Sequence, residues 1–293
     1  MNTYSQKITS LQSNAIKDLF ISLNAVFDVV QYSFWRAKTN TFQAIYYTSG
    51  KLLIQGKNIE NVAIEVDKII GVKSCFEQSN LIDFNQEKYI GTDESGKGDF
   101  FGPLVVAGVQ VDKNNKQKFI ELGIKDSKKL DDKKILMLAN QIKANSVHSV
   151  VVITPVKYNE LYAKFSNLNK LLAWGHARAI ENILEKSPCN YALADKFGDE
   201  SLIKNALMQK GRSIVLNQMV RAESDIAVAA ASVLARAEFV KRMQELELKY
   251  ELQLSKGVSE KVIQQAKNFI SKYSFDSLNE IAKMHFKTVN ELR

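Results

Sequence analysis

Two adjacent acids stand at the end of an apolar run, where side chains able to do chemistry are often found. Asp93 and Glu94 follow Tyr89-Ile90-Gly91-Thr92, and the glycine-rich stretch Ser95-Gly96-Lys97-Gly98 comes next. Paired carboxylates suit a divalent metal ion. A flexible glycine loop that carries one cation suits a phosphate backbone. The segment therefore predicts a metal site beside a phosphate-binding loop.

A nucleotide-binding P-loop is the first alternative for this stretch. Four residues separate Gly91 from Gly96, and Lys97 follows, as in that motif. However, Gly98 replaces the Ser or Thr that should ligate magnesium, and the two acids inside the loop would repel a triphosphate. Nucleotide hydrolysis is therefore disfavoured.

The acid pair alone is ambiguous, because acids are common at solvated strand ends. Neighbouring residues on a regular strand point to opposite faces of the sheet. Asp93 and Glu94 can share one metal ion only if the strand ends or bends between them, and the turn at Ser95-Gly96 permits that.

Two more acids stand at comparable positions. Asp195 closes the apolar strand predicted over Tyr191 to Ala194, and sites in α/β sheets tend to lie at such strand ends. Glu223 precedes a long predicted helix, where an acid also interacts favourably with the helix dipole. Each acid has an ordinary structural explanation, but four of them in a basic protein favour a metal centre.

Composition narrows the classes of partner. The chain has 293 residues, is 45% hydrophobic and carries a formal net charge of +8, which favours a polyanion such as nucleic acid. The two cysteines and three histidines lack metal-ligand spacing, so neither a zinc site nor a disulfide framework is expected. The N-terminus has no apolar signal core and no run of about 18 apolar residues exists, so we expect a cytoplasmic protein.

The elements that must position these residues fall into two predicted domains. Residues 1–80 predict a small α+β unit, with a helix over 10–28, strands within 33–55 and a helix over 58–70. A polar linker is expected over 72–88. Residues 88–293 alternate strands with helices, which predicts an α/β sheet. The elements expected there are strands at 88–93, 104–111, 148–154, 191–195 and 213–216, and helices at 132–144, 168–186 and 224–252.

The first motif also resembles that of a known family. The run from Asp93 to Leu104 resembles the first motif of the bacterial ribonucleases HIII, in the type 2 ribonuclease H family, because its Gly-Lys-Gly replaces the Gly-Arg-Gly of ribonuclease HII. Residues 46–57 resemble the N-terminal TATA-binding-protein-like extension of that family. Further resemblances are found at residues 126–130, 193–198, 229–236 and 283–287.

The resemblance implies a ribonuclease H-like mixed sheet flanked by helices, with a small N-terminal α+β substrate-binding domain. It implies a monomeric enzyme that uses Mg²⁺ or Mn²⁺ to cleave the RNA strand of an RNA–DNA hybrid duplex, leaving 5′-phosphate and 3′-hydroxyl ends. No protein or membrane partner is implied. Three of the four family acids match directly as catalytic residues and metal ligands, namely Asp93, Glu94 and Asp195. The fourth catalytic acid maps to Glu223, with Asp225 as a rival because the spacing to the alanine run is short.

Substrate contacts are expected around the glycine loop. The Gly96-Lys97-Gly98 backbone can approach the sugar closely, and a 2′-hydroxyl is what distinguishes RNA from DNA there. The residues expected to bind substrate are Ser95, Gly96, Lys97, Gly98, Lys128 and Lys129. In the N-terminal unit Phe42, Tyr46 and Tyr47 could stack on nucleic acid, although core packing is the better interpretation for at least two of them.

Two other functions compete with this one. Another nuclease with a ribonuclease H fold, such as a resolvase or an integrase-like protein, would cut four-way DNA rather than a hybrid. A non-catalytic nucleic-acid binder would be unaffected by the substitution Asp93→Asn.

Overall fold

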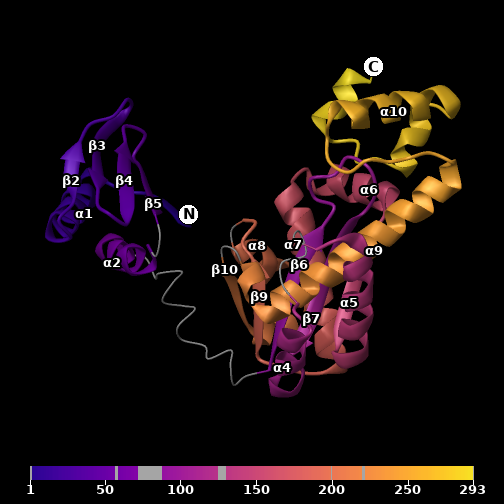
Figure 1. Ribbon diagram of the computed structural model, residues 1–293, viewed down its shortest axis with the longest axis horizontal. Helices are drawn as coiled ribbons and strands as arrows, with labels where there is room; N and C mark the ends of the chain where they lie inside the picture. The colour runs from indigo at the N-terminus through magenta and orange to yellow at the C-terminus, as the bar shows by residue number, and fades with distance from the viewer. Residues whose placement is uncertain are drawn as a thin grey trace. The chain divides into compact units, whose positions relative to one another are not determined.

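The chain forms two compact units, Met1–Asp83 and Phe84–Arg293 (Figure 1). The computed structural model describes residues 2–56, 59–71, 88–124, 130–198, 200–219 and 222–292. In these ranges no helix combines the length and the apolar character needed to cross a bilayer. Each unit is described below by itself.

The first unit is a five-stranded antiparallel sheet with two helices. Its strands lie in the order β1-β5-β4-β3-β2. The elements are β1 (Asn2–Lys7), α1 (Ser10–Ser22), β2 (Val26–Asp28), β3 (Ser33–Lys38), β4 (Phe42–Tyr47), β5 (Lys51–Gly56) and α2 (Glu60–Ile70). The alternation along β4 sends Phe42, Ala44 and Tyr46 into a core that Ile16 and Phe20 of α1 complete. The expected core packing of Phe42 and Tyr46 is therefore confirmed, while Tyr47 is half-buried.

The helix expected over 10–28 is too long. It ends at Ser22, and Asn24 has a left-handed backbone with φ +58° that a continuing helix does not tolerate. Val26 to Asp28 instead pair with β3 as an edge strand. The strand β1, which pairs along β5, was not predicted.

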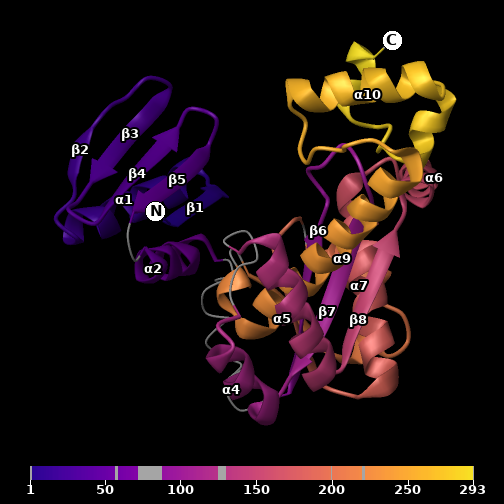
Figure 2. The ribbon, with the colours of Figure 1, turned by 45° about the vertical axis from the view of Figure 1, so that its right-hand side comes forward.

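The second unit is built on a mixed sheet in the strand order β10-β9-β6-β7-β8; Figure 1 labels β10, β9, β6 and β7, and Figure 2 labels β8. The strands are β6 (Tyr89–Ser95), β7 (Leu104–Val111), β8 (His148–Ile153), β9 (Tyr191–Asp195) and β10 (Val215–Met219). β6 to β8 form an antiparallel meander, whereas β9 is parallel to both β6 and β10. The predicted α/β mixed sheet is confirmed.

Helices cover both faces of this sheet. They are α4 (Lys113–Glu121), α5 (Asp132–Asn145), α6 (Pro155–Phe165), α7 (Leu168–Lys186), α8 (Glu200–Ala206), α9 (Ile226–Tyr250) and α10 (Glu260–Lys272). Successive residues of β6 point to opposite faces of the sheet and enter different cores. Tyr89 packs with residues of α5 and α9, and Ile90 packs with residues of α7. One face of the sheet thus belongs to α9 and the other to α7.

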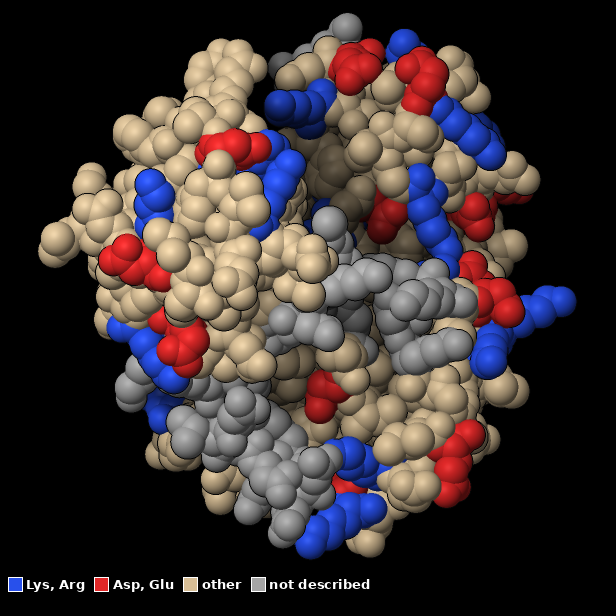
Figure 3. Space-filling model, turned by 60° about the vertical axis from the view of Figure 1, so that its left-hand side comes forward, with Lys and Arg blue, Asp and Glu red and all other residues tan. Residues whose placement is uncertain are grey.

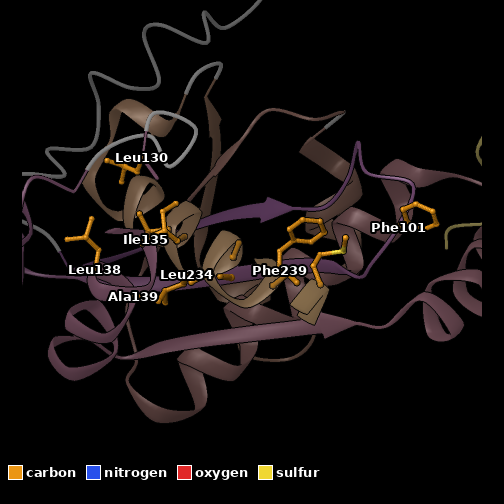
Figure 4. Packing of buried hydrophobic residues seen from close by; sticks show 14 of the residues in the cluster. Phe101, Leu130, Ile135, Leu138, Ala139, Leu234 and Phe239 are labelled. Carbon is orange, nitrogen blue, oxygen red and sulfur yellow. The ribbon is translucent and has the colours of Figure 1, made fainter. Parts of the chain in front are cut away.

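Close packing of α9 on β6 depends on small residues. A Cβ atom built on Gly91 would lie 2.3 Å from the backbone carbon of Ala227, so only glycine fits there. Ala229 to Ala231 and Ser232 are all buried against the sheet. Farther along α9, Leu234 and Phe239 continue this core (Figure 4). The helix is thereby held with its first turn beside the strands that carry the acids.

The bounds of most predicted elements hold in this unit. The helix over 168–186 and the strand over 191–195 match the structure. The strand expected to end at residue 93 runs on to Ser95, and the strand expected from 213 begins at Val215 after a 3-10 turn, Gly211–Ser213. The linker predicted over 72–88 lies, except for Lys88, outside the described residues.

Candidate active site

Asp93 and Glu94 point to opposite faces of the sheet. β6 stays paired with β7 through Asp93, Glu94 and Ser95, so consecutive side chains alternate as on any regular strand. The side chain of Asp93 is hydrogen-bonded to that of Ser232 on α9. Glu94 turns to α7, where its Oε2 lies 3.2 Å from Nε2 of His176. The bend that was expected to bring both carboxylates to one side is therefore absent from this strand.

Asp195 is the closest counterpart of Asp93 on the next strand. Thr92 pairs with Ala194 in the parallel ladder between β6 and β9, so the residues that follow them are neighbours in register. Leu193, two residues before Asp195, packs with Val228 of α9, which puts Asp195 on the α9 face together with Asp93. Adjacent strands are about 4.8 Å apart, so the sheet itself brings these two acids together.

The pKa of the Asp93 carboxyl is affected by this arrangement. Burial, the charge of Glu94 and the charge of Asp195 raise the pKa of Asp93 to about 7, against hydrogen bonds from Ser232 and the Glu94 amide that lower it. Burial and two acidic neighbours both oppose ionisation of Asp93, and a bound cation would favour it. The pKa of Glu94 moves the other way: burial would raise it, but His176 and Lys97 lower it overall.

The two candidates for the fourth acid stand in different places. Glu223 belongs to the 3-10 turn Ala222–Ser224, whose first amide, that of Ala222, donates to Oδ1 of Asp195 over 3.1 Å. Its own side chain is outside what the structure describes. Asp225 caps α9 by accepting from the amides of Ala227 and Val228, and its Oδ2 accepts from the Tyr89 hydroxyl over 2.7 Å. Tyr89 lies four residues before Asp93, about 13 Å along the strand, so Asp225 is committed to the helix start.

His176 was not singled out in the sequence. It is fully buried on α7, with Nδ1 2.8 Å from the Thr92 hydroxyl and its ring stacked on Phe197 at 4.9 Å. A neutral ring that donates from Nε2 to Glu94 and accepts from Thr92 satisfies both nitrogens. One histidine in an apolar helix carries no signal of this role, because the role arises only from packing against β6.

The glycine loop after β6 has its own constraints. Gly96 has φ +89°, and a Cβ atom there would lie 2.2 Å from the carbonyl oxygen of Pro103. By contrast, a Cβ atom on Gly98 would meet no atom within 4 Å. Lys97 is partly exposed, with Nζ 3.3 Å from Oε1 of Glu94 and 5.8 Å from the centre of the Phe197 ring. Lys128 and Lys129 lie outside the described residues.

The described side chains do not by themselves form a complete set of metal ligands. No group of three His, Cys, Asp or Glu side chains in the described part of the chain is arranged to hold a metal ion. The donor set nevertheless suits a hard divalent cation, since carboxylates are the ligands such ions take and the raised pKa of Asp93 reflects burial together with two acidic neighbours. On the face shown in Figure 3, basic and acidic side chains are interspersed, so the excess positive charge is not collected there in one patch.

Comparisons with known proteins identify the family. Residues 90–289 match the family model described as ribonuclease HII, and residues 4–71 match a domain of unknown function. A ribonuclease HIII of Protochlamydia amoebophila is 42% identical over 89% of this chain and 87% of its own length, and one of Chlamydia felis is 38% identical over 97% and 96%.

Solved structures extend the likeness to the whole chain. A crystal structure of Bst-RNase HIII in complex with Mn²⁺ superimposes with a TM-score of 0.68 at 27% identity, covering 99% of this chain and 98% of that one. The predicted fold, family resemblance and ribonuclease H class are confirmed by these matches. The chain belongs to the ribonuclease HII family and, within it, to the ribonucleases HIII.

Proposed function

We propose that this chain hydrolyses the RNA strand of RNA–DNA hybrids with a divalent metal ion, Mg²⁺ or Mn²⁺, leaving 5′-phosphate and 3′-hydroxyl ends. The observation that carries the proposal is the pair Asp93 and Asp195 on adjacent parallel strands, with the pKa of Asp93 raised to about 7 by burial and by its acidic neighbours. Such a pair is suited to a cation that neutralises it and not to a neutral ligand. The activity of the relatives supplies the reaction type.

The residues that would hold the ion are Asp93 and Asp195 on the α9 face, with Glu223 from the turn whose Ala222 amide binds Asp195, and Glu94 from the opposite face of β6. A bound divalent cation would supply Lewis-acid stabilisation of charge at the scissile phosphate. Ser232 and the amides of Glu94 and Ala222 orient the two aspartates by hydrogen bonds. Glu94 is kept ionised by His176 and Lys97.

The glycine loop would place the substrate strand. Open space around Gly98 lets the backbone approach a ribose closely, which is what recognition of a 2′-hydroxyl requires. Lys97 would exchange its contact with Glu94 for a phosphate, and Ser95 would add a hydrogen bond. Such contacts address the sugar and the phosphate, so binding should weaken with salt and depend little on base sequence.

The two predicted domains would divide the work. Residues 88–293 would carry catalysis, and residues 1–80 would add affinity for the hybrid duplex through a sheet face not covered by α1 and α2. On that face Arg36, Ile45 and Tyr47 are half-buried and Lys38 is exposed. We expect the protein to act in the cytoplasm as a monomer.

Cleavage of a labelled hybrid with Mg²⁺ or Mn²⁺ tests the proposal. Asp93→Asn, Asp195→Asn and Glu223→Gln should each abolish cleavage while leaving the circular dichroism spectrum unchanged. Asp225→Ala is the matched control, because it removes an acid that caps α9; it should keep activity and lose about 1 kcal/mol of stability. Wild-type protein that cuts four-way DNA but not the hybrid would favour the resolvase-like alternative, and full activity of Asp93→Asn would refute the assigned site.

A further inference from the structure

A lysine is buried beneath the glycine loop, far from any role in the reaction just described. The Lys283 side chain is fully buried, at 0% exposure. Its ammonium group donates to three main-chain carbonyl oxygens, those of Asp99 at 2.8 Å, Gly102 at 2.7 Å and Phe101 at 3.4 Å. An ammonium has three hydrogens, so these acceptors use its full donor capacity.

The three carbonyls belong to the loop that joins β6 to β7. All three acceptors of the Lys283 ammonium are therefore main-chain oxygens, and none is a carboxylate oxygen. The Asp99 carboxylate, the acid nearest in sequence to these carbonyls, instead accepts from the amide of Gly257 over 2.6 Å. Three carbonyl dipoles that point at one spot repel one another unless a cation lies between them. In its protonated form Lys283 is that cation, and its three hydrogen bonds fix the backbone path over residues 99–102.

The main chain around Lys283 also forms hydrogen bonds with this loop. The Lys283 amide donates to the carbonyl of Phe100 at 2.9 Å, and the Gly102 amide donates to the carbonyl of Ile281 at 2.8 Å. Phe101 pairs with Ala282 in an isolated β-bridge. Phe100 is buried in the same core as the α9 side chains, and so is Phe101 (Figure 4). The second half of the loop is thus bound to residues about 180 positions later in the chain.

Stability alone does not explain a lysine at this position. Removing an ammonium from water is costly, and burial lowers the pKa of Lys283 to about 7. An apolar side chain of similar length would fill the same volume without that cost. What an apolar side chain cannot do is hold three carbonyls at one point.

We propose that Lys283 is a positioning residue, which sets the conformation of the Ser95–Pro103 loop and so places Gly96-Lys97-Gly98 against the substrate strand. The inference rests on the proposed substrate-binding function of that loop. The Lys283 ammonium bonds neither to the acids of the site nor to Gly96 or Gly98; it acts through the carbonyls of Asp99, Phe101 and Gly102.

Steady-state cleavage of the labelled hybrid at saturating Mn²⁺ tests this role. Lys283→Met, which keeps the length and loses the cation, should lower kcat/KM about tenfold to a hundredfold, mainly through a higher KM, because the loop contacts substrate in both ground and transition states. Lys283→Arg, which keeps charge and donors, should recover part of the loss. Val289→Ala is the matched control, since Val289 lies in the same core but its apolar side chain cannot hydrogen-bond the loop carbonyls, and it should leave KM unchanged.

A double-mutant cycle shows whether the effect passes through the loop. Lys97→Met and Lys283→Met should be less than additive in KM if both act on loop placement. Additive effects, or a change in KM within twofold for Lys283→Met, would overturn the proposal. If Lys283→Met does not fold, Asn159→Ala serves instead, because Asn159 holds the Ala282 carbonyl and the Met284 amide on either side of Lys283.

Amide hydrogen exchange separates this inference from the proposed function. Faster exchange at residues 99–102 in Lys283→Met, with the rest of the sheet unchanged, shows loop positioning whether or not the protein cuts hybrids. Unchanged exchange at these amides would overturn the inference even if the wild-type enzyme is active. An inactive wild type with normal Mn²⁺ binding would instead count against the proposed function.

Discussion

Glu94 and His176 are joined across the α7 face of the sheet, with Oε2 and Nε2 3.2 Å apart. The contact holds the carboxylate on the opposite face from Asp93 and keeps it ionised in a buried place. The active-site acids are thus divided between two faces of one strand, and a histidine on a helix stabilises the acid that lies on the face away from α9.

Replacing His176 should therefore damage both stability and activity. His176→Ala leaves the buried Glu94 carboxylate and the Thr92 hydroxyl without this partner, so we expect a loss of about 1–3 kcal/mol in urea unfolding and a lower kcat. The effects of Glu94→Gln and His176→Ala should be less than additive. Full additivity would show that the two side chains do not act together.

The raised pKa of Asp93 predicts a pH dependence for the metal-free protein. Unfolded aspartate loses its proton near pH 4, whereas folded Asp93 keeps it until about pH 7. The folded state binds more protons in this window, so Asp93 makes the free energy of unfolding fall as pH rises from 4 to 7. Denaturant unfolding at pH 5 and pH 7.5 should show a smaller decline in Asp93→Asn than in wild type.

The same carboxyl should make metal binding depend on pH. Because the ion competes with one proton, Mn²⁺ affinity should rise about tenfold per pH unit below 7 and level off above it. Calorimetric titration from pH 5.5 to pH 8.5 measures this slope. A flat profile would contradict the assignment of Asp93 as a metal ligand that titrates near neutrality.

Two glycines on either side of the acids should respond differently to the same substitution. Gly91→Ala puts a methyl group 2.3 Å from the backbone of Ala227, so α9 must shift, and we expect a loss of about 1–3 kcal/mol or more. Gly98→Ala meets no atom within 4 Å and should fold normally. If the loop approaches the sugar as proposed, Gly98→Ala should still raise KM for the hybrid. Thermal unfolding and steady-state cleavage distinguish the two effects.

Removing the first unit should affect binding more than catalysis. The unit has a core of its own, centred on Phe20, Trp35 and Phe42, and its deletion leaves the core around α9 intact. A chain that begins after residue 80 should bind Mn²⁺ normally and lose much of its affinity for the hybrid. Binding isotherms at two salt concentrations provide the measurement, and unchanged hybrid affinity would exclude a substrate-binding role for the unit.

Local patterns in the sequence predicted the five strands and the helices α5, α7 and α9 of the second unit, but not α4, α6, α8 and α10. The apolar runs that end on Asp93 and Asp195 are strands whose residues before the acid are buried, except for the half-buried Tyr191, and the alanines after Asp225 pack as expected. The register between β6 and β9, which brings the two aspartates together, depends on pairing between segments about 100 residues apart. No local pattern encodes such pairing.

The missed features arise from packing rather than propensity. His176 and Lys283 look ordinary in sequence, since their partners lie on β6 and on the loop after it. Val26 and Phe27 continue the helical spacing of α1, but pairing with β3 prevails over that pattern after Asn24. The bend expected between Asp93 and Glu94 is absent because ladder pairing with β7 continues through Ser95.

The hydrogen bonds of Lys283 to the loop also affect the order in which parts of the active site form during folding. These contacts join segments about 180 residues apart, and such long-range contacts form slowly, so the sheet can assemble before the loop acquires its final path. A folding chain would then bring its carboxylates together before its glycine loop reaches the conformation proposed to contact the ribose. The ability to bind a metal ion would therefore appear before the ability to recognise RNA.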